Sequence, residues 1–309
     1  MNKKICEMVA DRVLEELNKG VAPWSQPWFG SDRFVSHVNG KHYSLLNCML
    51  LGKPGEYATF KQIEKEGGKV KKGAKSKIVV YWNPQKKEIE EDGEKKEVTY
   101  FILRYYRVFN LNDCENMKKK YLNDDDTHFV HEVVRDAEDV IKGYCDANPT
   151  LKIVREEKSN RAFYRPSEDM IKVPCIEQYE NVAEYYSTLF HEMTHSTGHW
   201  SRLGRFKESG CVAAFGGEDY GKEELIAELG AAALCGKCGV ETKASFRNSA
   251  AYLKGWTEAI KGNPEMIVAA AGKADKAVEF ILGEEKANPQ YSRQISTMPA
   301  LMASSDLIC

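Results

Sequence analysis

Two histidines and a glutamate lie within five consecutive residues of this sequence, His191-Glu192-Met193-Thr194-His195. If the segment is helical, positions i and i+4 point from one face, so both imidazoles can reach a single metal ion. Glu192 would then lie beside the ion and could take the proton of a water whose pKa the metal lowers to about 7. This HExxH spacing is typical of metallopeptidases and predicts zinc ligands at His191 and His195 with Glu192 as catalytic base. The competing interpretation is two polar histidines on an ordinary helix.

The residues before the motif must form the helix that holds it. Residues 182–190 contain no Pro or Gly and place Leu189 and Phe190 where they can pack inward. Gly198, three residues after His195, is a plausible helix end. The sequence therefore favours one helix that carries both histidines.

A catalytic zinc usually has three protein ligands, so a third is expected elsewhere. Position 201, where a metzincin would have its third histidine, is Ser201. A second helical pattern over 222–234 offers Glu224 and Glu228 on one face, followed by small residues from Gly230 that would let two helices approach closely. We favour Glu228 as the ligand and Glu224 as a partner that orients a histidine, and the reverse assignment stays open. Ligand type would also accept manganese or cobalt in place of zinc.

Other candidates surround this centre. Tyr220 or His199 could stabilise the oxyanion of a peptide undergoing hydrolysis. Cys235 and Cys238 form the only close cysteine pair, which could be redox-active or half of a metal site, although no second such pair exists. The nine cysteines are otherwise scattered, which fits a reducing compartment better than a disulfide scaffold.

The 309 residues are enough for two domains. Residues 1–115 carry 20 Lys and Arg against 16 Asp and Glu, whereas the rest carries 24 against 30, so the two halves are expected to have different partners. A polar stretch from Asn110 to Asp126 suggests a linker between them. No run of eighteen apolar residues and no signal-peptide core occur, which predicts a cytoplasmic protein without a membrane partner.

The first half contains an amphipathic helix over 4–18 and two segments rich in β-branched and aromatic residues, 78–82 and 98–109, which are expected to pair as strands. The charged segment 85–97, with its Asp92-Gly93, is predicted to be their connection. Ahead of them, 61–77 holds seven lysines and two glutamates. Lysine-rich loops beside aromatic strands suit single-stranded nucleic acid, whereas an ordinary solvated surface is the alternative.

Taken together, the sequence resembles the ArdC antirestriction family, which is related to the N-terminal parts of conjugative TraC-type primases. The resemblance is carried by residues 23–28, 43–47, 59–62, 68–77 with 80–82, 191–205, 220–235 and 248–256. It implies a single-stranded DNA-binding domain, a zincin-like metallopeptidase domain, and a role in protecting mobile DNA from host restriction. One departure is Ser44, where the family tends to have an arginine, so that Lys41 or His42 would have to supply that phosphate contact.

We therefore expect an α+β protein with a small antiparallel-sheet DNA-binding domain over 1–115, a linker over 116–128, a mainly helical zincin-like domain over 129–285 with a short sheet from 151–154 and 170–173, and a tail over 286–309. Single-stranded DNA and a host protein cleaved by the zincin are the expected partners. The alternative is a protein that masks DNA without proteolysis and whose metal is structural or vestigial. The candidate DNA contacts are Trp24, Trp28, Lys41, Tyr43, Asn47, Lys61, Lys69, Lys71, Lys72, Lys75, Lys77 and Trp82.

Overall fold

The computed structural model describes residues 2–25, 29, 33–91, 94–122, 133–156, 161–179, 181–206, 218–240 and 250–284. Its first half contains the helices α1 (Lys3–Leu17), α2 (Leu45–Leu51) and α3 (Phe60–Lys65), the strands β1 (Phe34–Ser36), β2 (Gly55–Ala58), β3 (Lys69–Val70), β4 (Lys77–Glu91), β5 (Glu94–Asn110) and β6 (Cys114–Glu115), and two short 3-10 turns, η1 (Pro23–Ser25) and η2 (Leu111–Asp113). The second half contains the helices α4 (Val133–Ala147), α5 (Val182–Ser196), α6 (Glu218–Lys237), α7 (Ala250–Gly262) and α8 (Glu265–Ile281), the strands β7 (Lys152–Glu156), β8 (Phe163–Arg165) and β9 (Met170–Pro174), and the turns η3 (Pro166–Glu168) and η4 (Ile176–Gln178). The protein is therefore mixed α and β, as predicted.

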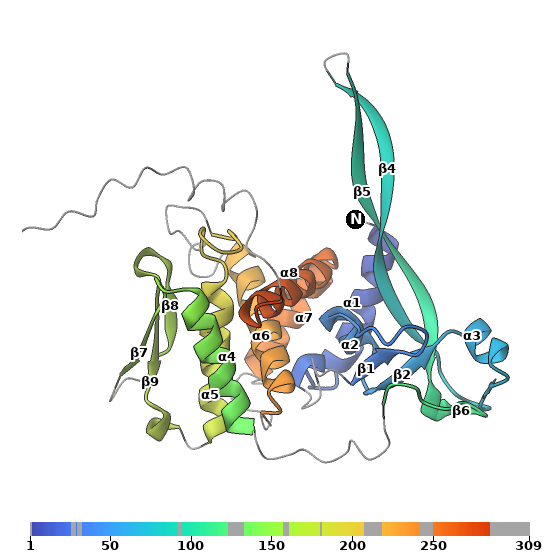
Figure 1. Cartoon of the computed structure of the whole chain (residues 1–309), viewed down its shortest axis with the longest axis horizontal. Helices are drawn as coiled ribbons and strands as arrows, with labels where there is room; N and C mark the ends of the chain where they lie inside the picture. Colours follow the sequence, from blue (N-terminus) through green and yellow to red (C-terminus); the bar gives the residue numbers. More distant parts are fainter. Residues whose placement is uncertain are drawn as a thin grey trace, which may run out of the picture.

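The main sheet of the first half has the order β1-β2-β5-β4 and is mixed, because β1 and β2 run parallel. The sheet is otherwise antiparallel, as expected. The predicted hairpin is also longer than expected, since β4 and β5 pair without interruption from Lys77↔Val108 to Glu91↔Glu94. Most of the charged segment 85–97 is strand rather than loop, and only residues 92–93 lie outside the described chain. The hairpin consequently projects from the body as a long arm (Figure 1).

In the second half, β7 and β9 pair in parallel and β8 completes the sheet as an antiparallel edge, with the order β7-β9-β8. The pairing of 151–154 with 170–173 predicted from sequence is therefore present. Helix α5 packs against this sheet on one side and against α6 on the other. The site-bearing helix thus lies in the middle of its half (Figure 1).

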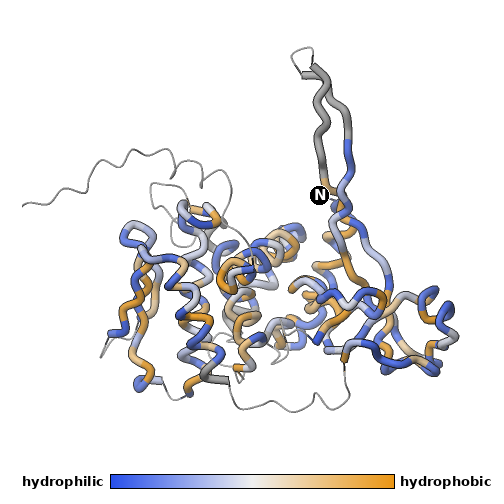
Figure 2. Tube along the Cα trace, viewed as in Figure 1, coloured by the Kyte–Doolittle hydropathy of each residue, from blue (hydrophilic) through white to orange (hydrophobic). Residues whose placement is uncertain are grey.

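One apolar core joins the two halves. Buried residues of α1 and α2 belong to the same cluster as those of α5, α6 and α8, and α1 and α2 contact α8 directly. The backbone N–H of Leu45 at the start of α2 donates to Asp275 Oδ1 of α8 at 2.9 Å. Figure 2 shows apolar segments along these helices, whereas the chain around α3 is largely hydrophilic. The first half therefore packs against the second mainly through α1, α2 and η1.

The predicted linker is only partly within the described residues. The backbone N–H groups of Lys120, Tyr121 and Leu122 all donate to the buried carboxylate of Glu56, at 3.1, 2.6 and 2.8 Å. The chain up to residue 122 is thus fixed to the first half, while residues 123–132 and the predicted tail lie outside the description. Among the described helices, none combines the length and the apolar character that crossing a membrane requires.

Candidate functional site

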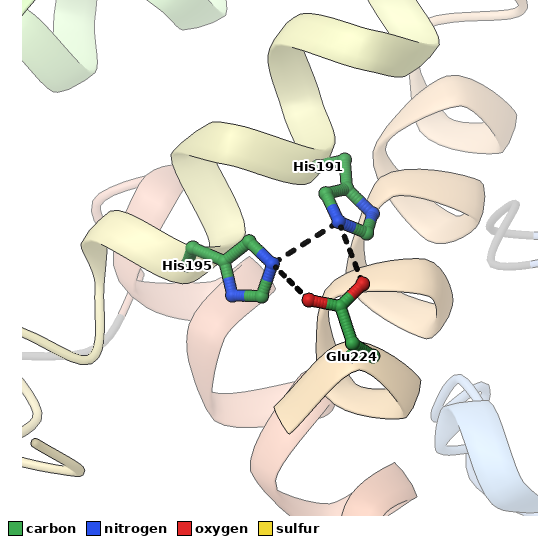
Figure 3. Close-up of side chains that lie close together, drawn as sticks. All are labelled: His191, His195 and Glu224. Atoms are coloured by element: carbon green, nitrogen blue, oxygen red, sulfur yellow. Dashed lines mark hydrogen bonds and ion pairs between the residues drawn. The ribbon is translucent and has the colours of Figure 1, made fainter. Parts of the chain in front are cut away.

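The HExxH segment occupies the last turns of α5. The helix begins where the side chain of Asn181 accepts the Ala183 N–H at 2.9 Å, and it ends at Ser196, close to the predicted stop at Gly198. Because Leu189 and Phe190 are fully buried, the helix is held in a fixed rotation about its axis. That rotation turns His191 and His195 toward α6 (Figure 3).

The two histidines and one glutamate of α6 converge on a common point. Nε2 of His191 lies 3.1 Å from Nε2 of His195, and Glu224 places one carboxylate oxygen 3.3 Å from His195 Nε2 and the other 3.6 Å from His191 Nε2. One potential ligand atom from each residue lies within 4.8 Å of the other two. Two imidazoles and a carboxylate form a donor set of the kind that binds a catalytic zinc with one position left open, so these residues fit a divalent metal.

This geometry favours Glu224 as the third ligand, whereas the sequence analysis favoured Glu228. Glu228 Oε1 lies 3.5 Å from Nδ1 of His191, on the side of the ring away from the cluster. Glu224, one turn earlier, lies where α6 crosses α5 opposite both rings. Glu224 and Glu228 lie on the same face of α6, so the sequence cannot distinguish them. The point where α6 crosses α5 decides which of the two faces both histidines. The alternative that the sequence left open, with Glu228 as the orienting partner, matches the observed positions.

The close approach of the two helices depends on Gly230. A Cβ atom at this position would lie 2.5 Å from Cγ2 of Thr194, the residue just before His195 in the motif. The predicted role of the small residues after Glu228 is therefore confirmed at this glycine.

Sequence reasoning missed Glu223, the residue before Glu224. Its Oε1 lies 3.4 Å from Nδ1 of His195, and its carboxylate accepts hydrogen bonds from Arg205 Nε at 3.1 Å and from a second guanidinium nitrogen at 2.7 Å. Burial alone would raise the pKa of Glu223, but the hydrogen bond with His195 and the charge of Arg205 hold it below the ordinary value. No sequence signal identifies this contact, because Arg205 comes from a loop whose path depends on the fold.

Carboxylates also dominate the electrostatics of the cluster. Burial would lower the pKa of His195, yet its contacts with Glu223 and Glu224 and the nearby charge of Glu192 raise it to about 10. Burial would raise the pKa of Glu224, but its hydrogen bonds with His191 and His195 hold that pKa well below its usual range. The site therefore attracts positive charge, which a divalent cation would supply.

Of the other residues predicted to belong to this centre that the structure describes, only Glu192 lies beside the histidines. Glu192 is buried beside His195, as the motif requires. His199 is directed elsewhere: its Nδ1 lies 2.6 Å from the Ser201 hydroxyl, and it also hydrogen-bonds with the backbone of Pro166. The side chain of Tyr220 lies outside the described residues. The structure therefore gives His199 structural partners and does not test Tyr220.

A buried ion pair anchors the segment that follows α5. The guanidinium of Arg202 hydrogen-bonds both carboxylate oxygens of Asp169, and its Nε donates to the Ser196 carbonyl at 2.7 Å. Asp169 has a left-handed backbone, φ 45°, and also accepts from Thr150 and Tyr164 at 2.8 Å. Burial would raise the pKa of Asp169, but Arg202 and these hydroxyls lower it. The end of the histidine-bearing helix is thereby tied to the sheet.

The candidate DNA contacts divide into buried and exposed groups. Trp24 is 5% exposed and belongs to the core, so its assignment as a DNA contact was wrong, and Trp28 lies outside the described residues. Asn47 is also buried, since its side chain pairs with both backbone groups of Val80 at 2.8 and 2.9 Å. Its role is to fasten α2 to β4 rather than to contact a ligand. Tyr43 is partly buried and hydrogen-bonds with Tyr106.

The exposed group lies on the arm, on α3 and β3, and in loops of the first half. Trp82 is 44% exposed, and the predicted lysines are all exposed: Lys41, Lys61, Lys69, Lys71, Lys72, Lys75 and Lys77. Of these, Lys71 also donates to the Asn112 carbonyl at 2.9 Å.

The structure adds aromatic residues that sequence reasoning assigned only to a strand. Phe101 is 60% exposed and Tyr105 43% exposed. Because directly opposed residues of an antiparallel pair share a face, the register Val80↔Tyr105, Trp82↔Leu103 and Pro84↔Phe101 places Tyr105, Trp82 and Phe101 on one face. Arg107, opposite Ile78, belongs to that face as well. We call these four residues the arm face.

The cysteine pair lies at the C-terminal end of α6, with Cys238 just after the helix. Cys235 and Cys238 are both buried, and neither forms a disulfide within the part of the chain that the structure describes. Burial raises the pKa of the Cys238 thiol to about 12. Because the thiolate is the reactive form, this pair acts as packing.

Comparisons with known proteins match the two halves separately. The family described as the N-terminal domain of anti-restriction factor ArdC matches residues 3–109, and the zincin-like metallopeptidase family matches residues 147–273. Two DNA primase TraC sequences from Escherichia coli are 29% and 28% identical to the chain over 99% and 93% of its length. The chain spans only 30% and 20% of those primases. An uncharacterized protein of Sinorhizobium fredii is 24% identical over 91% of the chain and 92% of its own length.

Two solved structures resemble the whole chain. The metal-free crystal structure of the antirestriction protein ArdC from plasmid R388 is 31% identical, with a TM-score of 0.66, over 90% of this chain and 97% of that one. The Mn(II)-bound structure of the same protein is 30% identical, with a TM-score of 0.68 and the same coverage. Both halves and their arrangement are therefore shared with a protein whose crystals have been obtained with and without a divalent metal.

Proposed function

Because this chain belongs to the ArdC antirestriction family, we propose that it is an antirestriction protein of a mobile genetic element with two working surfaces. One is a divalent-metal centre between α5 and α6 that hydrolyses a peptide bond in a host protein. The other is the arm, which binds single-stranded DNA. The convergence of His191, His195 and Glu224 is the observation that carries the proposal for the enzyme.

In the proposed centre, His191, His195 and Glu224 would hold the metal. When bound, a divalent ion supplies Lewis-acid activation of a water molecule and polarises the peptide carbonyl. The carboxylate of Glu192 accepts the proton of the attacking water and returns it to the leaving amine. Glu228 keeps His191 in its orientation through Nδ1, at 3.5 Å. Zinc is our first expectation, and the Mn(II)-bound relative makes manganese the competing ion.

The DNA-binding proposal is supported by the arm face and by the lysines before β4. Tyr105, Trp82 and Phe101 lie at successive cross-strand positions on one face of the hairpin, and all three rings are exposed and could stack on bases. Stacking of this kind is sequence-tolerant and contributes about 1–3 kcal/mol per base. Arg107 and the exposed lysines 69, 72, 75 and 77 would neutralise phosphates. The TraC primases that match the chain are DNA enzymes by name, which agrees with a DNA ligand.

The experiment that tests both surfaces measures metal content and DNA binding in the same preparations. Wild-type protein should contain about one divalent ion per chain, which His191→Ala loses while single-strand binding survives. Trp82→Ala should keep the metal and weaken single-strand binding. No metal in the wild type, with DNA binding intact, would remove the metal centre and favour a protein that only masks DNA.

Glu192→Gln separates proteolysis from masking. The variant should keep its metal and its DNA affinity because glutamine preserves the side-chain shape, but it cannot accept the proton. If protection against restriction in a recipient cell is lost, hydrolysis is required. Full protection by Glu192→Gln would contradict the enzymatic proposal, and loss of protection on charge reversal at Lys72 and Lys75 would then support masking.

A further inference from the structure

Arg205 lies in the loop after α5 and is nearly buried, with 9% of its side chain exposed. Its guanidinium reaches both helices of the centre at once. Toward α5 it donates to the Thr194 carbonyl at 2.9 Å and to the Thr197 hydroxyl at 2.8 Å. Toward α6 it donates two hydrogen bonds to Glu223, at 3.1 and 2.7 Å. A single side chain therefore fixes Glu223 relative to the helix that carries the histidines.

Because Glu223 also contacts His195, fixing its carboxylate helps to fix the orientation of that imidazole. Its Oε1, which accepts the 2.7 Å bond from Arg205, is also the oxygen that lies 3.4 Å from His195 Nδ1. A neutral imidazole carries its proton on one nitrogen and a lone pair on the other. In the metal-bound form the ring of His195 would keep one proton, on Nδ1 and directed at Glu223, and its lone pair would lie on Nε2, which faces Glu224 and His191.

We propose that Arg205 is a positioning residue of the metal centre, which acts through Glu223 to keep the Nε2 lone pair of His195 directed at the metal. Arg205 does not touch the site where the metal would lie. Its planar guanidinium can satisfy both oxygens of Glu223 while it bonds α5, which a lysine ammonium cannot reproduce. The inference rests on the proposed metal centre.

The test compares metal affinity in Arg205→Lys, in Glu223→Gln and in the double variant. Dissociation constants for zinc and manganese are measured by competition with a chelator at constant pH, and the visible spectrum of the cobalt-loaded protein reports the ligand field. Loss of an outer-sphere partner typically weakens metal binding by about 10–100-fold, and we expect that range for each single variant, with an altered cobalt spectrum. If Arg205 acts through Glu223, the double variant should be no weaker than Glu223→Gln.

Thr197→Val is the matched control. It removes one hydrogen bond of Arg205 on the α5 side and leaves Glu223 untouched. We expect a lower melting temperature for the metal-free control but unchanged metal affinity and cobalt spectrum. Equal weakening by Thr197→Val, or additive losses in the double variant, would show that Arg205 only anchors the loop and would overturn the proposal.

The wild type and His191→Ala separate this inference from the proposed function. Metal binding by the wild type that is lost in His191→Ala, combined with wild-type affinity in Arg205→Lys and Glu223→Gln, would refute the positioning role alone. A wild type that binds no divalent ion would refute both.

Discussion

The proposed metal centre and the arm face are built in opposite ways. Around the centre, each histidine has one nitrogen near Glu224 and the other near a further glutamate, and one of those glutamates is held by Arg205. On the arm face, Tyr105, Trp82 and Phe101 are each at least 43% exposed. A site for one small ion needs its donors fixed to within a fraction of an ångström. On a surface that binds a flexible polymer, each side chain can contribute to the affinity independently. The comparison predicts strongly coupled effects in the centre and separate, moderate effects on the arm.

The largest effect should come from breaking the buried ion pair behind the centre. Asp169→Asn removes the charge opposite Arg202, and leaving one partner of a buried pair uncompensated costs about 3–5 kcal/mol of unfolding free energy. Chemical denaturation followed by circular dichroism measures the loss, with Glu168→Gln, an exposed neighbour, as the control. A loss below about 1 kcal/mol, the range of surface pairs, would contradict the anchoring role of this pair.

The next effect distinguishes the two glutamates of α6. Glu224→Ala should weaken metal binding by more than the roughly 100-fold that is typical of outer-sphere changes, because it removes a ligand. Glu228→Ala should stay within about 10–100-fold, because it removes only the partner of His191 Nδ1. Chelator competition on both proteins gives the two affinities. The reverse order would restore Glu228 as the ligand.

The next prediction concerns Glu56 of β2, the strand that pairs with β5 at the base of the arm. Its buried hydrogen bonds should make this part of the first half as sensitive to substitution as the centre. Burial opposes the charge, but hydrogen bonds from His37 and three backbone N–H groups hold the pKa of Glu56 below its ordinary value. A lowered pKa contributes stability that is present above the unfolded pKa, about 4.3, and is lost as pH falls through the folded one.

Glu56→Gln should therefore cost about 1.5–3 kcal/mol at pH 7, the range for hydrogen bonds to charged groups, and should flatten the acid limb of the stability curve. Urea unfolding between pH 3 and 7 measures both effects, with the exposed Glu64→Gln on α3 as control. An acid limb of unchanged steepness would show that Glu56 does not contribute to it.

The smallest effects are expected on the arm face. Trp82→Ala and Tyr105→Ala should each reduce single-strand binding by about 1–3 kcal/mol and should be additive within experimental error when combined. Fluorescence anisotropy with a labelled oligonucleotide measures the affinities. The buried Trp24 provides a contrast, because Trp24→Phe should alter stability without altering DNA affinity. Equal losses of affinity in Trp24→Phe and Trp82→Ala would show that the arm face is not the binding surface.

Much of this architecture could be predicted because the signals are local. Residues 78–82 and 98–109 have strand composition, and they pair as expected. The extension of the hairpin through 85–91 and 94–97 was missed because that charged sequence has weak strand propensity on its own, and pairing with the opposite strand decides its conformation. The parallel pair β1 and β2 was missed for a related reason, since a three-residue strand carries almost no pattern.

The sequence by itself determined that one helix would present His191, Glu192 and His195 together, because a helical turn fixes the relation of i to i+4 whatever surrounds it. It also determined that α6 would offer glutamates on a single face. Only the tertiary structure decided that Glu224 meets both Nε2 atoms, that Glu223 and Arg205 support His195, and that Trp24 is buried while Trp82 is exposed. These outcomes depend on where one element crosses another, which is set by packing of the whole core and is not encoded in any local spacing.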